Sequence, residues 1–463
     1  MDRVDVAVVG GGPAGSSAAY EAARRGADAL VLEKGVPRAD RTELGPDSTD
    51  AAGILDYWVD IMGIHPDEFP DGVVETTLDR AEFVGPTESV TMYGTGIESS
   101  YDHFGYTMHR ARFDDFLRSR AEDAGARYRT GASVKAVDTD LSAGDGPRHV
   151  LHVGGGEEVG AESLILADGP QRTVTNGVLD AYLPDGESAS ERLASTRTNH
   201  IAYQEYRRFP EEAYEDVAGA IRFWWGVMPG HTAYPWVFPN RDRVCRVGLT
   251  MPIGLDLDTV EDREAYALLE SDDERVPSGG EYVRRLLERE YGDEYDVESD
   301  FPVVEDAGKS GGTETYPISS TRPIESPVEA GVAVAGGAMG STSAFHEGGD
   351  HTAVRTGAIA GELAAEGELT AYNDRWQAAI GEEVRRSVTM AEMVRDYGPD
   401  DWDRDFRTAQ KMLADGGEDG YDLFERKLTG GLSAAKLFLG YKYRKWTLRD
   451  GAYVQLREDE YVY

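Results

Sequence analysis

The sequence predicts an α/β fold built from more than one structural unit. An apolar strand, a glycine-rich turn and an Ala-rich helix open the chain, and a second strand follows at residues 29–32. Further strand patterns lie at 221–227 and 243–251, and from residue 366 onward the pattern is helical. The 463 residues exceed the size at which one hydrophobic core usually stops growing, so two or three units are expected.

The composition is that of a folded protein with a strongly acidic surface. Apolar residues make up 40% of the chain and aromatic residues 10%, which argues against disorder. The 86 acidic residues outweigh 47 basic ones and give a net charge of −39. Such a surface is typical of salt-loving (halophilic) organisms and repels phosphate backbones, so no nucleic-acid partner is expected.

A single cysteine, Cys245, lies within the strand pattern at 243–251. One thiol cannot form an intramolecular disulfide, hold an iron–sulfur cluster or build a Cys-rich zinc site, and no metal site is expected. We interpret Cys245 as a small buried strand residue. The chain shows no run of 18 apolar residues and no signal peptide, which predicts a cytoplasmic protein without a spanning helix.

The opening segment has the features of a dinucleotide site. A buried strand at residues 4–9 leads directly into the glycines, and a helix follows the turn. Gly10 permits the tight turn, Gly12 lets the backbone approach a pyrophosphate, and Gly15 allows the helix to pack closely on the strand. Free N–H groups at the helix N-terminus suit an anion. The expected nucleotide contacts are Gly10, Gly12, Pro13, Ala14 and Gly15.

Glu33 adds an acidic group at the end of the second strand. Its separation from the turn suits a carboxylate that accepts hydrogen bonds from an adenosine ribose. The same charge would repel the 2′-phosphate of NADP. We include the neighbouring Lys34 in the expected site.

Three further segments match one protein family in the expected order. They are a helix start at 109–117, a strand ending in Asp-Gly at 164–169, and a strand with a Gly-rich turn at 332–340. With the first turn, they resemble the FAD-dependent family that includes aromatic hydroxylases, geranylgeranyl reductases and electron-transfer-flavoprotein:quinone oxidoreductases. The resemblance implies a discontinuous Rossmann-like FAD-binding domain, with further cofactor contacts at Arg112, Asp168, Gly169, Gly336 and Gly337.

Gly337 departs from the pattern of this family. The family usually has Asp at this position, and that carboxylate holds the ribityl chain of FAD. Two explanations stay open: flavin binding is weakened, or the chain belongs to a subgroup that anchors the ribityl group otherwise.

The segment 233–239 resembles the Tyr-x-Trp-x-Phe-Pro signature of geranylgeranyl reductases. Alternation places Tyr234, Trp236 and Phe238 on one face of a strand. Periodicity alone favours a sheet that packs on a hydrophobic core. The resemblance instead implies a substrate-binding wall for a long apolar chain beside the flavin. Residues 371–386 resemble the same reductases, whereas the cysteine that they carry after the second strand is missing from this sequence.

A competing resemblance lies at 349–357, which is similar to a stretch of flavoprotein:quinone oxidoreductases. Those enzymes carry a four-cysteine cluster, and a separate ferredoxin-like partner would have to replace it here. The leading prediction is therefore an FAD-dependent reductase of isoprenoid double bonds in membrane lipid or quinone side chains. A quinone-linked dehydrogenase is the alternative, and a flavin monooxygenase is the third possibility.

For the reductase, the resemblance implies hydride transfer from reduced FAD and a proton from elsewhere. The candidates for proton supply are His346, Glu347 and Tyr234, although a lone histidine is more often structural. Backbone N–H groups at Gly348 and Gly349, before the next helix, are placed to stabilise negative charge on the reduced flavin. The sequence shows no second nucleotide fingerprint, and both NAD(P)H and a ferredoxin stay open as electron donors.

These assignments divide the chain into three regions. The FAD-binding domain is expected at 1–75, 105–175 and 315–365, the β-sheet substrate domain at 76–104 and 176–314, and a helical C-terminal region at 366–463. Residues 424–449 are basic and aromatic, against the overall acidic charge. They predict either a helix docked on the acidic body or a peripheral contact with an anionic membrane.

Overall fold

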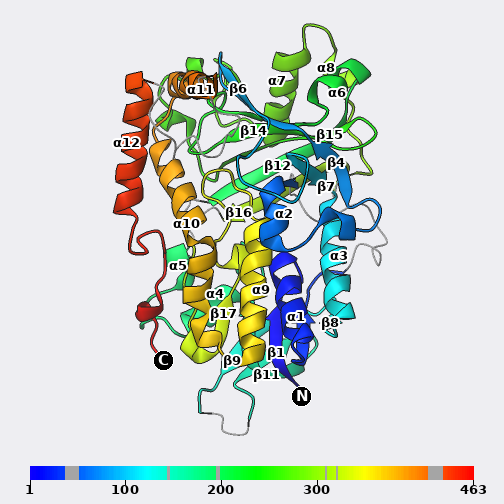
Figure 1. The fold of residues 1–463 in the computed structure, drawn as a ribbon, viewed down its shortest axis with the longest axis vertical. Helices are drawn as coiled ribbons and strands as arrows, with labels where there is room; N and C mark the ends of the chain where they lie inside the picture. Colours follow the sequence, from blue (N-terminus) through cyan, green and yellow to red (C-terminus); the bar gives the residue numbers. More distant parts are fainter. Residues whose placement is uncertain (37–51, 143–145, 194–198, 308–309, 320–321, 415–430) are drawn as a thin grey trace.

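The computed structural model describes residues 1–36, 52–142, 146–193, 199–307, 310–319, 322–414 and 431–463. Two sheets lie one above the other along the long axis of the molecule, and both termini lie at the end that carries the first sheet (Figure 1). Residues 41–46, where this sequence lacks the cysteine that the similar reductases carry after the second strand, lie outside the described residues.

The first sheet has the strand order β8-β2-β1-β11-β10-β9, with β17 also paired to β11. Strands β1, β2, β8 and β17 run parallel to their neighbours, whereas β9, β10 and β11 form antiparallel pairs. The turn at 154–156 joins β10 to β11 as a hairpin. The strand bounds are β1 Asp2–Val9, β2 Ala29–Leu32, β8 Arg127–Arg129, β9 Val134–Thr139, β10 His149–Val153, β11 Glu157–Leu166 and β17 Val332–Val334.

Helices α1 (Pro13–Arg24) and α9 (Asp350–Glu366) lie side by side against this sheet (Figure 1). Glycines make the approach possible. A Cβ atom on Gly357 would lie 2.0 Å from the Ala14 carbonyl oxygen, and one on Gly361 would lie 2.0 Å from that of Ala18. Helix α3 (Arg110–Asp123) packs on α1 from the other side. The first two turns of α1 are therefore packed against the middle of α9.

The second sheet has the order β16-β12-β15-β14-β13-β5-β6. Helices α6 (Glu211–Val217) and α7 (Gly279–Tyr291) pack on it, and α8 (Val297–Asp300) contacts α7. Strand β16 pairs with β12 along its whole length, so residues 315–319 lie in the second sheet. The boundary expected from the sequence had assigned these residues to the FAD-binding domain. The bounds are β5 Arg80–Val84, β6 Ser89–Met92, β12 Asn199–Arg208, β13 Ala220–Trp224, β14 Tyr234–Pro239, β15 Val244–Pro252 and β16 Thr313–Ser319.

Smaller elements connect the two sheets. A three-stranded sheet has the order β3-β7-β4, and α2 packs on α9. The bounds are β3 Gly53–Leu55, α2 Asp56–Met62, β4 Val74–Leu78 and β7 Gly105–Met108. Helices α4 (Thr175–Asp180) and α5 (Ala189–Leu193) belong instead to the core of the first sheet.

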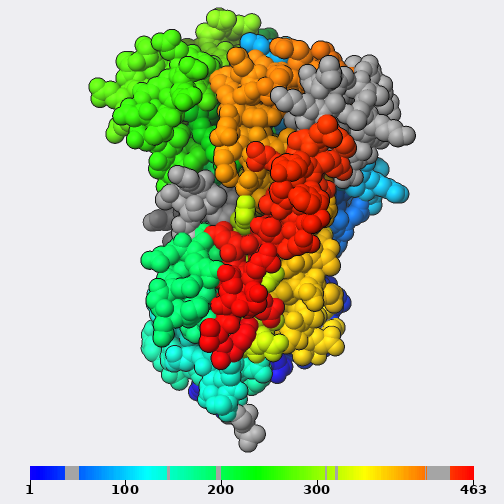
Figure 2. All heavy atoms as spheres, turned by 90° about the vertical axis from the view of Figure 1, so that its left-hand side faces the viewer, coloured from blue at the N-terminus to red at the C-terminus, as the bar shows by residue number. Residues whose placement is uncertain are grey.

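The described part of the C-terminal region contains the helices α10 (Tyr372–Met393), α11 (Pro399–Ala414) and α12 (Gly431–Thr447). Helix α10 packs on both α9 and α12, and α11 packs on β6. After α12 the chain returns to the first sheet unit, where Leu456 pairs with Ile324. In Figure 2, α12 is the red helix that crosses the surface beside the orange helices.

Candidate functional site

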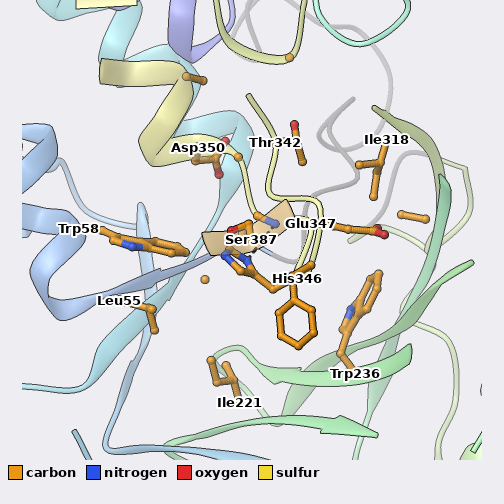
Figure 3. Close-up of a pocket in the computed structure, with 18 of the residues that line it drawn as sticks. Leu55, Trp58, Ile221, Trp236, Ile318, Thr342, His346, Glu347, Asp350 and Ser387 are labelled. Carbon is orange, nitrogen blue, oxygen red and sulfur yellow. Dashed lines mark hydrogen bonds between the residues drawn. The ribbon is translucent and has the colours of Figure 1, made fainter. Parts of the chain in front are cut away.

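One cavity of about 720 Å³ connects the two sheet units. It begins at the glycine turn before α1 and at Glu33, passes the loop before α9, and continues between β14 and α11. Figure 3 shows its middle part, with His346 between Trp58 and Trp236. A volume of this size is typical of sites for small molecules and cofactors.

The glycine turn is shaped by backbone approach. Gly10 has a φ of +99°, and a Cβ atom there would lie 2.3 Å from the Ala167 carbonyl oxygen. A Cβ on Gly15 would lie 1.9 Å from the Gly10 oxygen. At Gly12, by contrast, no protein atom lies within 4 Å of that position, so the space in front of the turn is open.

The N-terminus of α1 fits the pyrophosphate of a dinucleotide such as FAD. Gly11, Gly12, Pro13 and Ala14 line the cavity. The helix has no side-chain cap and no acidic residue in its first turn, so its first N–H groups are available to an anion. The residues present therefore fit the group that the sequence implies.

Glu33 lies against this turn. Its Oε2 accepts a hydrogen bond from the Gly11 N–H at 2.6 Å, and its Oε1 accepts one from the Gly35 N–H at 2.5 Å. The carboxylate lines the cavity, as a ribose-binding group must. Lys34 is exposed to solvent and is not among the lining residues.

Arg110, and not Arg112, reaches the main cavity from α3. The Nη1 of Arg110 lies 2.9 Å from the Oδ1 of Asp350, at the start of α9. Arg112 donates to the Asp71 carbonyl oxygen at 3.1 Å and lines a separate surface depression. The placement expected for Arg112 is thus corrected, because residues two apart on an α-helix point in nearly opposite directions.

The Asp168 carboxylate accepts hydrogen bonds from nearby residues of the protein itself. Its Oδ2 accepts from the backbone N–H groups of Val174 and Thr175 at 2.6 and 3.2 Å, and its Oδ1 accepts from the Thr175 hydroxyl at 2.5 Å. These bonds fix the start of α4 and the turn before it. The turn presents Gly169 and Pro170 to the cavity, whereas Asp168 is not among the lining residues.

The turn that carries Gly337 faces the same part of the cavity. Gly336 has a φ of +62°, which favours glycine, and it packs against α1. A Cβ on Gly337 would lie 3.1 Å from the Cδ of Pro170, so a side chain here would have to displace that ring slightly. The buried Arg172 donates through Nε to the Ala338 oxygen at 2.7 Å and ties the two turns together. No sequence motif pointed to Arg172.

The far half of the cavity is apolar and aromatic. Tyr234, Trp236 and Phe238 point into it from β14, whereas Val237 points to the opposite side, into the core beneath α7. Side chains from several other elements complete the wall, and sequence reasoning missed them: Trp58, Ile221, Phe223, Trp225, Ile318, Phe345, Trp402 and Phe406. Of these, Trp402 and Phe406 could have been predicted to share one face of a helix, because they are four residues apart.

Glu347 is a buried acid on the cavity wall. Its side chain is 3% exposed, and the residue has a φ of +58°. The Thr250 hydroxyl donates to its Oε2, and the His200 Nδ1 lies 3.3 Å from its Oε1. Burial raises the pKa of Glu347 to about 8, although the Thr250 hydrogen bond opposes the shift. Figure 3 shows the carboxyl group above Trp236.

His346 and Tyr234 are held by the same loop. The Tyr234 hydroxyl donates to the His346 carbonyl oxygen at 2.5 Å, and the His346 Nδ1 accepts from the Gly348 N–H at 3.2 Å. Burial, together with the nearby His351, lowers the pKa of His346 to about 4. Gly348 and Gly349 both line the cavity, and α9 begins after Gly349 without a side-chain cap.

His351 lies behind this loop. Its ring stacks on Trp58, with centroids 3.9 Å apart and planes 10° apart, and its Nε2 bonds the carboxylate of Glu383. Although burial opposes it, His351 and Arg355 hold the pKa of Glu383 at about 2. Trp58 lines the cavity, whereas His351 does not.

In the described part of the basic segment 424–449, helix α12 has one side packed on the protein and one side exposed to solvent. Residues 424–430 lie outside the described residues. On α12, Tyr441 is buried, Lys445 pairs with Glu382, and the Arg444 Nη1 lies 3.7 Å from Glu392, so this side docks on α10. Leu439, Tyr443 and Trp446 are 64%, 67% and 56% exposed. Among the described helices, none combines the length and the hydropathy that crossing a bilayer requires.

Comparisons with known proteins find similarity to FAD-dependent oxidoreductases and to archaeal lipid reductases. Residues 5–59 match the model of the FAD dependent oxidoreductase family. The digeranylgeranylglycerophospholipid reductase 1 of Methanopyrus kandleri is 27% identical over 409 residues, which cover 84% of this chain and 90% of that protein. The digeranylgeranylglycerophospholipid reductase of Methanothrix thermoacetophila is 28% identical over 413 residues, which cover 86% and 89%.

Solved structures share the fold. A geranylgeranyl bacteriochlorophyll reductase-like protein of Thermoplasma acidophilum superposes with a TM-score of 0.69 at 19% identity, over 97% of this chain and 99% of that one. A flavin-dependent brominase superposes with a TM-score of 0.58 at 16% identity, over 96% and 100%. The glycine turn, the cavity and these relatives lead to one conclusion: the chain is an FAD-dependent oxidoreductase whose fold matches that of a geranylgeranyl reductase-like protein.

Proposed function

We propose that the protein reduces isoprenoid double bonds of the geranylgeranyl type, in membrane lipid or quinone side chains. The observation that carries the proposal is the single cavity that joins the glycine turn to an aromatic chamber. A polar, backbone-lined end suits the cofactor, and an apolar end suits a long hydrocarbon chain. The names of the two archaeal reductases support the same substrate class.

FAD, when bound and reduced, supplies the hydride. The backbone of Gly12 and Ala14 would bind the pyrophosphate, and Glu33 would bind the ribose. Arg110 and the uncapped N-terminus of α9 place positive charge beside the cofactor, although Asp350 offsets part of it. The aromatic side chains of β14 hold the isoprenoid chain flat and exclude water from the reacting double bond.

Glu347 is the proton donor that the geometry favours among the three candidates. His346 is neutral at physiological pH because its pKa is about 4, and its Nδ1 already accepts a hydrogen bond. The Tyr234 hydroxyl donates to a carbonyl, and burial raises its pKa well above the usual value. The carboxyl of Glu347 still carries its proton at neutral pH. One alkene carbon accepts the hydride, the other takes the Glu347 proton, and Glu347 is left as a carboxylate.

The exposed side of α12 is proposed to contact an anionic membrane, which would bring the enzyme to a lipid substrate. Leu439, Tyr443 and Trp446 form an apolar stripe. The cations Lys442 and Arg449 flank it, each over an aromatic ring of the same helix. A cationic, aromatic surface on a protein of net charge −39 complements anionic headgroups. The neighbouring Phe438 lines the cavity, so the helix lies at its edge.

Vesicle binding tests this contact. Replacing Leu439, Tyr443 and Trp446 together by Ser should abolish co-sedimentation with vesicles that contain an anionic lipid at low salt. The control is Tyr93→Ser, which removes a similarly exposed aromatic ring that directly follows β6 and lies outside α12. Equal binding of both proteins would contradict the membrane contact.

Anaerobic flavin spectroscopy tests the proposed reaction. The holoenzyme, reduced with dithionite, should be reoxidised by a geranylgeranyl lipid and not by its saturated analogue. Reoxidation by a quinone alone would support the quinone-linked dehydrogenase instead. Reduction of the holoenzyme by NADPH or by a reduced ferredoxin, compared in the same cuvette, identifies the electron donor.

A further inference from the structure

One threonine hydroxyl on the cavity wall is not used by the protein itself. Thr342 lies in the loop before α9 and lines the cavity. The hydroxyls of its neighbours are bound inside the protein: Ser341 donates to Thr352 at 3.2 Å, and Ser343 donates to Ser387 at 3.1 Å. Neither serine lines this cavity. In the described part of the chain, by contrast, no group forms a hydrogen bond with the Oγ1 of Thr342.

A glycine keeps this hydroxyl accessible. A Cβ atom on Gly349 would lie 3.0 Å from the Oγ1 of Thr342 and 3.5 Å from its Cβ, so a side chain there would crowd the hydroxyl. In Figure 3, the hydroxyl points away from Trp236 and thus away from the aromatic chamber. A hydroxyl both donates and accepts hydrogen bonds. Thr342 therefore offers a polar contact that suits a hydroxylated ligand better than a hydrocarbon chain.

The turn before Thr342 touches the end of the cavity that fits the pyrophosphate. The Gly336 carbonyl oxygen accepts from the N–H groups of Met339 at 3.1 Å and of Ser341 at 3.3 Å, which closes the turn directly before Thr342. Gly336 packs against α1, where an added Cβ would lie 2.8 Å from the Cβ of Ala14. In FAD, the hydroxylated ribityl chain follows the pyrophosphate. The ribityl chain is thus the part of the cofactor that this threonine suits.

We propose that the Thr342 hydroxyl binds the ribityl chain of FAD and takes the place of the acid that Gly337 lacks. The inference rests on FAD binding and does not depend on the proposed lipid reduction. A carboxylate at position 337 would only accept hydrogen bonds from ribityl hydroxyls, whereas Thr342 can also donate one. Of the two explanations for Gly337, this assignment selects a site that anchors the ribityl chain from another residue.

Two substitutions at Thr342 separate the hydroxyl from the shape of the side chain. Thr342→Val keeps the branched shape and removes the hydroxyl, so the dissociation constant for FAD should rise about tenfold. Thr342→Ser keeps the hydroxyl and should bind FAD as the wild type does. The control is Thr370→Val, at an exposed threonine in the segment Leu369–Ala371. Flavin fluorescence after dilution of each holoenzyme measures FAD release.

Two fragments of the cofactor show which part of FAD the hydroxyl contacts. ADP carries no ribityl chain, and lumiflavin carries the flavin ring without that chain. Calorimetric titration of the full-length protein, stripped of FAD, should give the same affinity for each fragment in the wild type and in Thr342→Val. A weaker affinity for either fragment in the variant would overturn the ribityl assignment. Wild-type affinity for FAD itself in Thr342→Val would overturn it as well.

A double-mutant cycle tests whether Thr342 replaces the missing acid. Gly337→Asp should improve FAD binding more in Thr342→Val than in the wild type, because the vacated ribityl contact is available only in the variant. Any steric cost of the new side chain against Pro170 is common to both proteins and cancels in the comparison. Equal changes in both would mean that the two positions act independently and would overturn the replacement. These readouts need no lipid, so a failure of the proposed reduction would leave them unaffected.

Discussion

The two ends of the cavity are built on different principles. At the cofactor end, glycines set the shape: one added carbon on Gly10, Gly15, Gly357 or Gly361 would lie 2.3 Å or less from a backbone oxygen. At the substrate end, aromatic side chains from several strands and helices set the shape. Backbone contacts leave no room for adjustment, whereas a wall of side chains can be remodelled one residue at a time.

The largest expected effect lies at the glycine turn. Gly15→Ala forces a Cβ against the Gly10 oxygen, so we expect both a lower melting temperature and loss of FAD. Gly12→Ala meets no protein atom within 4 Å and has an allowed φ of −73°, so the apoprotein should melt as the wild type does and only FAD should be lost. Flavin absorbance after gel filtration, with thermal melting of the apoproteins, measures both.

Gly177→Ala is the control for these two variants, because it lies within α4 and its added Cβ meets nothing within 4 Å. It should keep both FAD and stability. Full FAD occupancy in Gly12→Ala would contradict the assignment of this turn as the pyrophosphate site.

The next largest effect is expected at Glu347, where the two ends meet. Glu347→Gln keeps the shape and removes the proton, so alkene reduction should fall by about 10²–10⁴-fold while FAD binding is kept. In the wild type, activity should decline as the pH rises through about 8, because the acid form is the donor. Stopped-flow reoxidation of reduced enzyme by lipid, recorded across pH, gives both results; a Gln variant with wild-type rates would exclude this donor.

The same residue links stability to pH. Folding raises the pKa of Glu347 from an ordinary 4.5 to about 8, so the folded protein binds this proton more tightly than the unfolded chain does. Its contribution to stability is present at low pH and is lost as the pH rises from about 4.5 to about 8. The free energy of unfolding, measured by urea titration, should fall more steeply over that range in the wild type than in Glu347→Gln.

The smallest effect is expected at the aromatic end, where the wall can be remodelled. Ala409 lines the cavity from α11, at the end remote from the glycine turn (Figure 1). Ala409→Trp should lower kcat/KM for a geranylgeranyl chain about tenfold. For a geranyl chain, which is half as long, kcat/KM should stay nearly unchanged. Arg407→Trp, on the exposed side of the same helix, is the control. Equal losses for both chains would mean that the chain does not extend to α11.

The difference between the two ends also explains how much the sequence could predict. The glycine turn, Glu33 and the alternation along β14 are local patterns. Gly12, Glu33 and the aromatic residues of β14 line the cavity, whereas Gly10 and Gly15 shape the turn from behind it. The sequence pointed to Arg112, whereas Arg110 lines the cavity. The family motif locates the start of the helix, but it does not show which arginine faces the cavity. Asp168 has a local role that no spacing reveals, since its partners come from the following turn.

The remaining residues of the site are brought together only by tertiary structure. His200 lies on β12 and meets Glu347 across the loop before α9, far along the chain. Trp402 and Phe406 come from a C-terminal helix that closes over the second sheet. Periodicity can show that such residues are buried, but it cannot show which cavity they line.

In the proposed function, the cofactor end and the aromatic end of the cavity form one site for an isoprenoid double bond. Mass spectrometry of a digeranylgeranyl lipid, after anaerobic incubation with the dithionite-reduced holoenzyme, tests it most directly. We predict products heavier by two hydrogens for each reduced double bond, formed by the wild type and not by Gly12→Ala. A lipid of unchanged mass, recovered while the same reduced enzyme is rapidly oxidised by a quinone, would contradict the account.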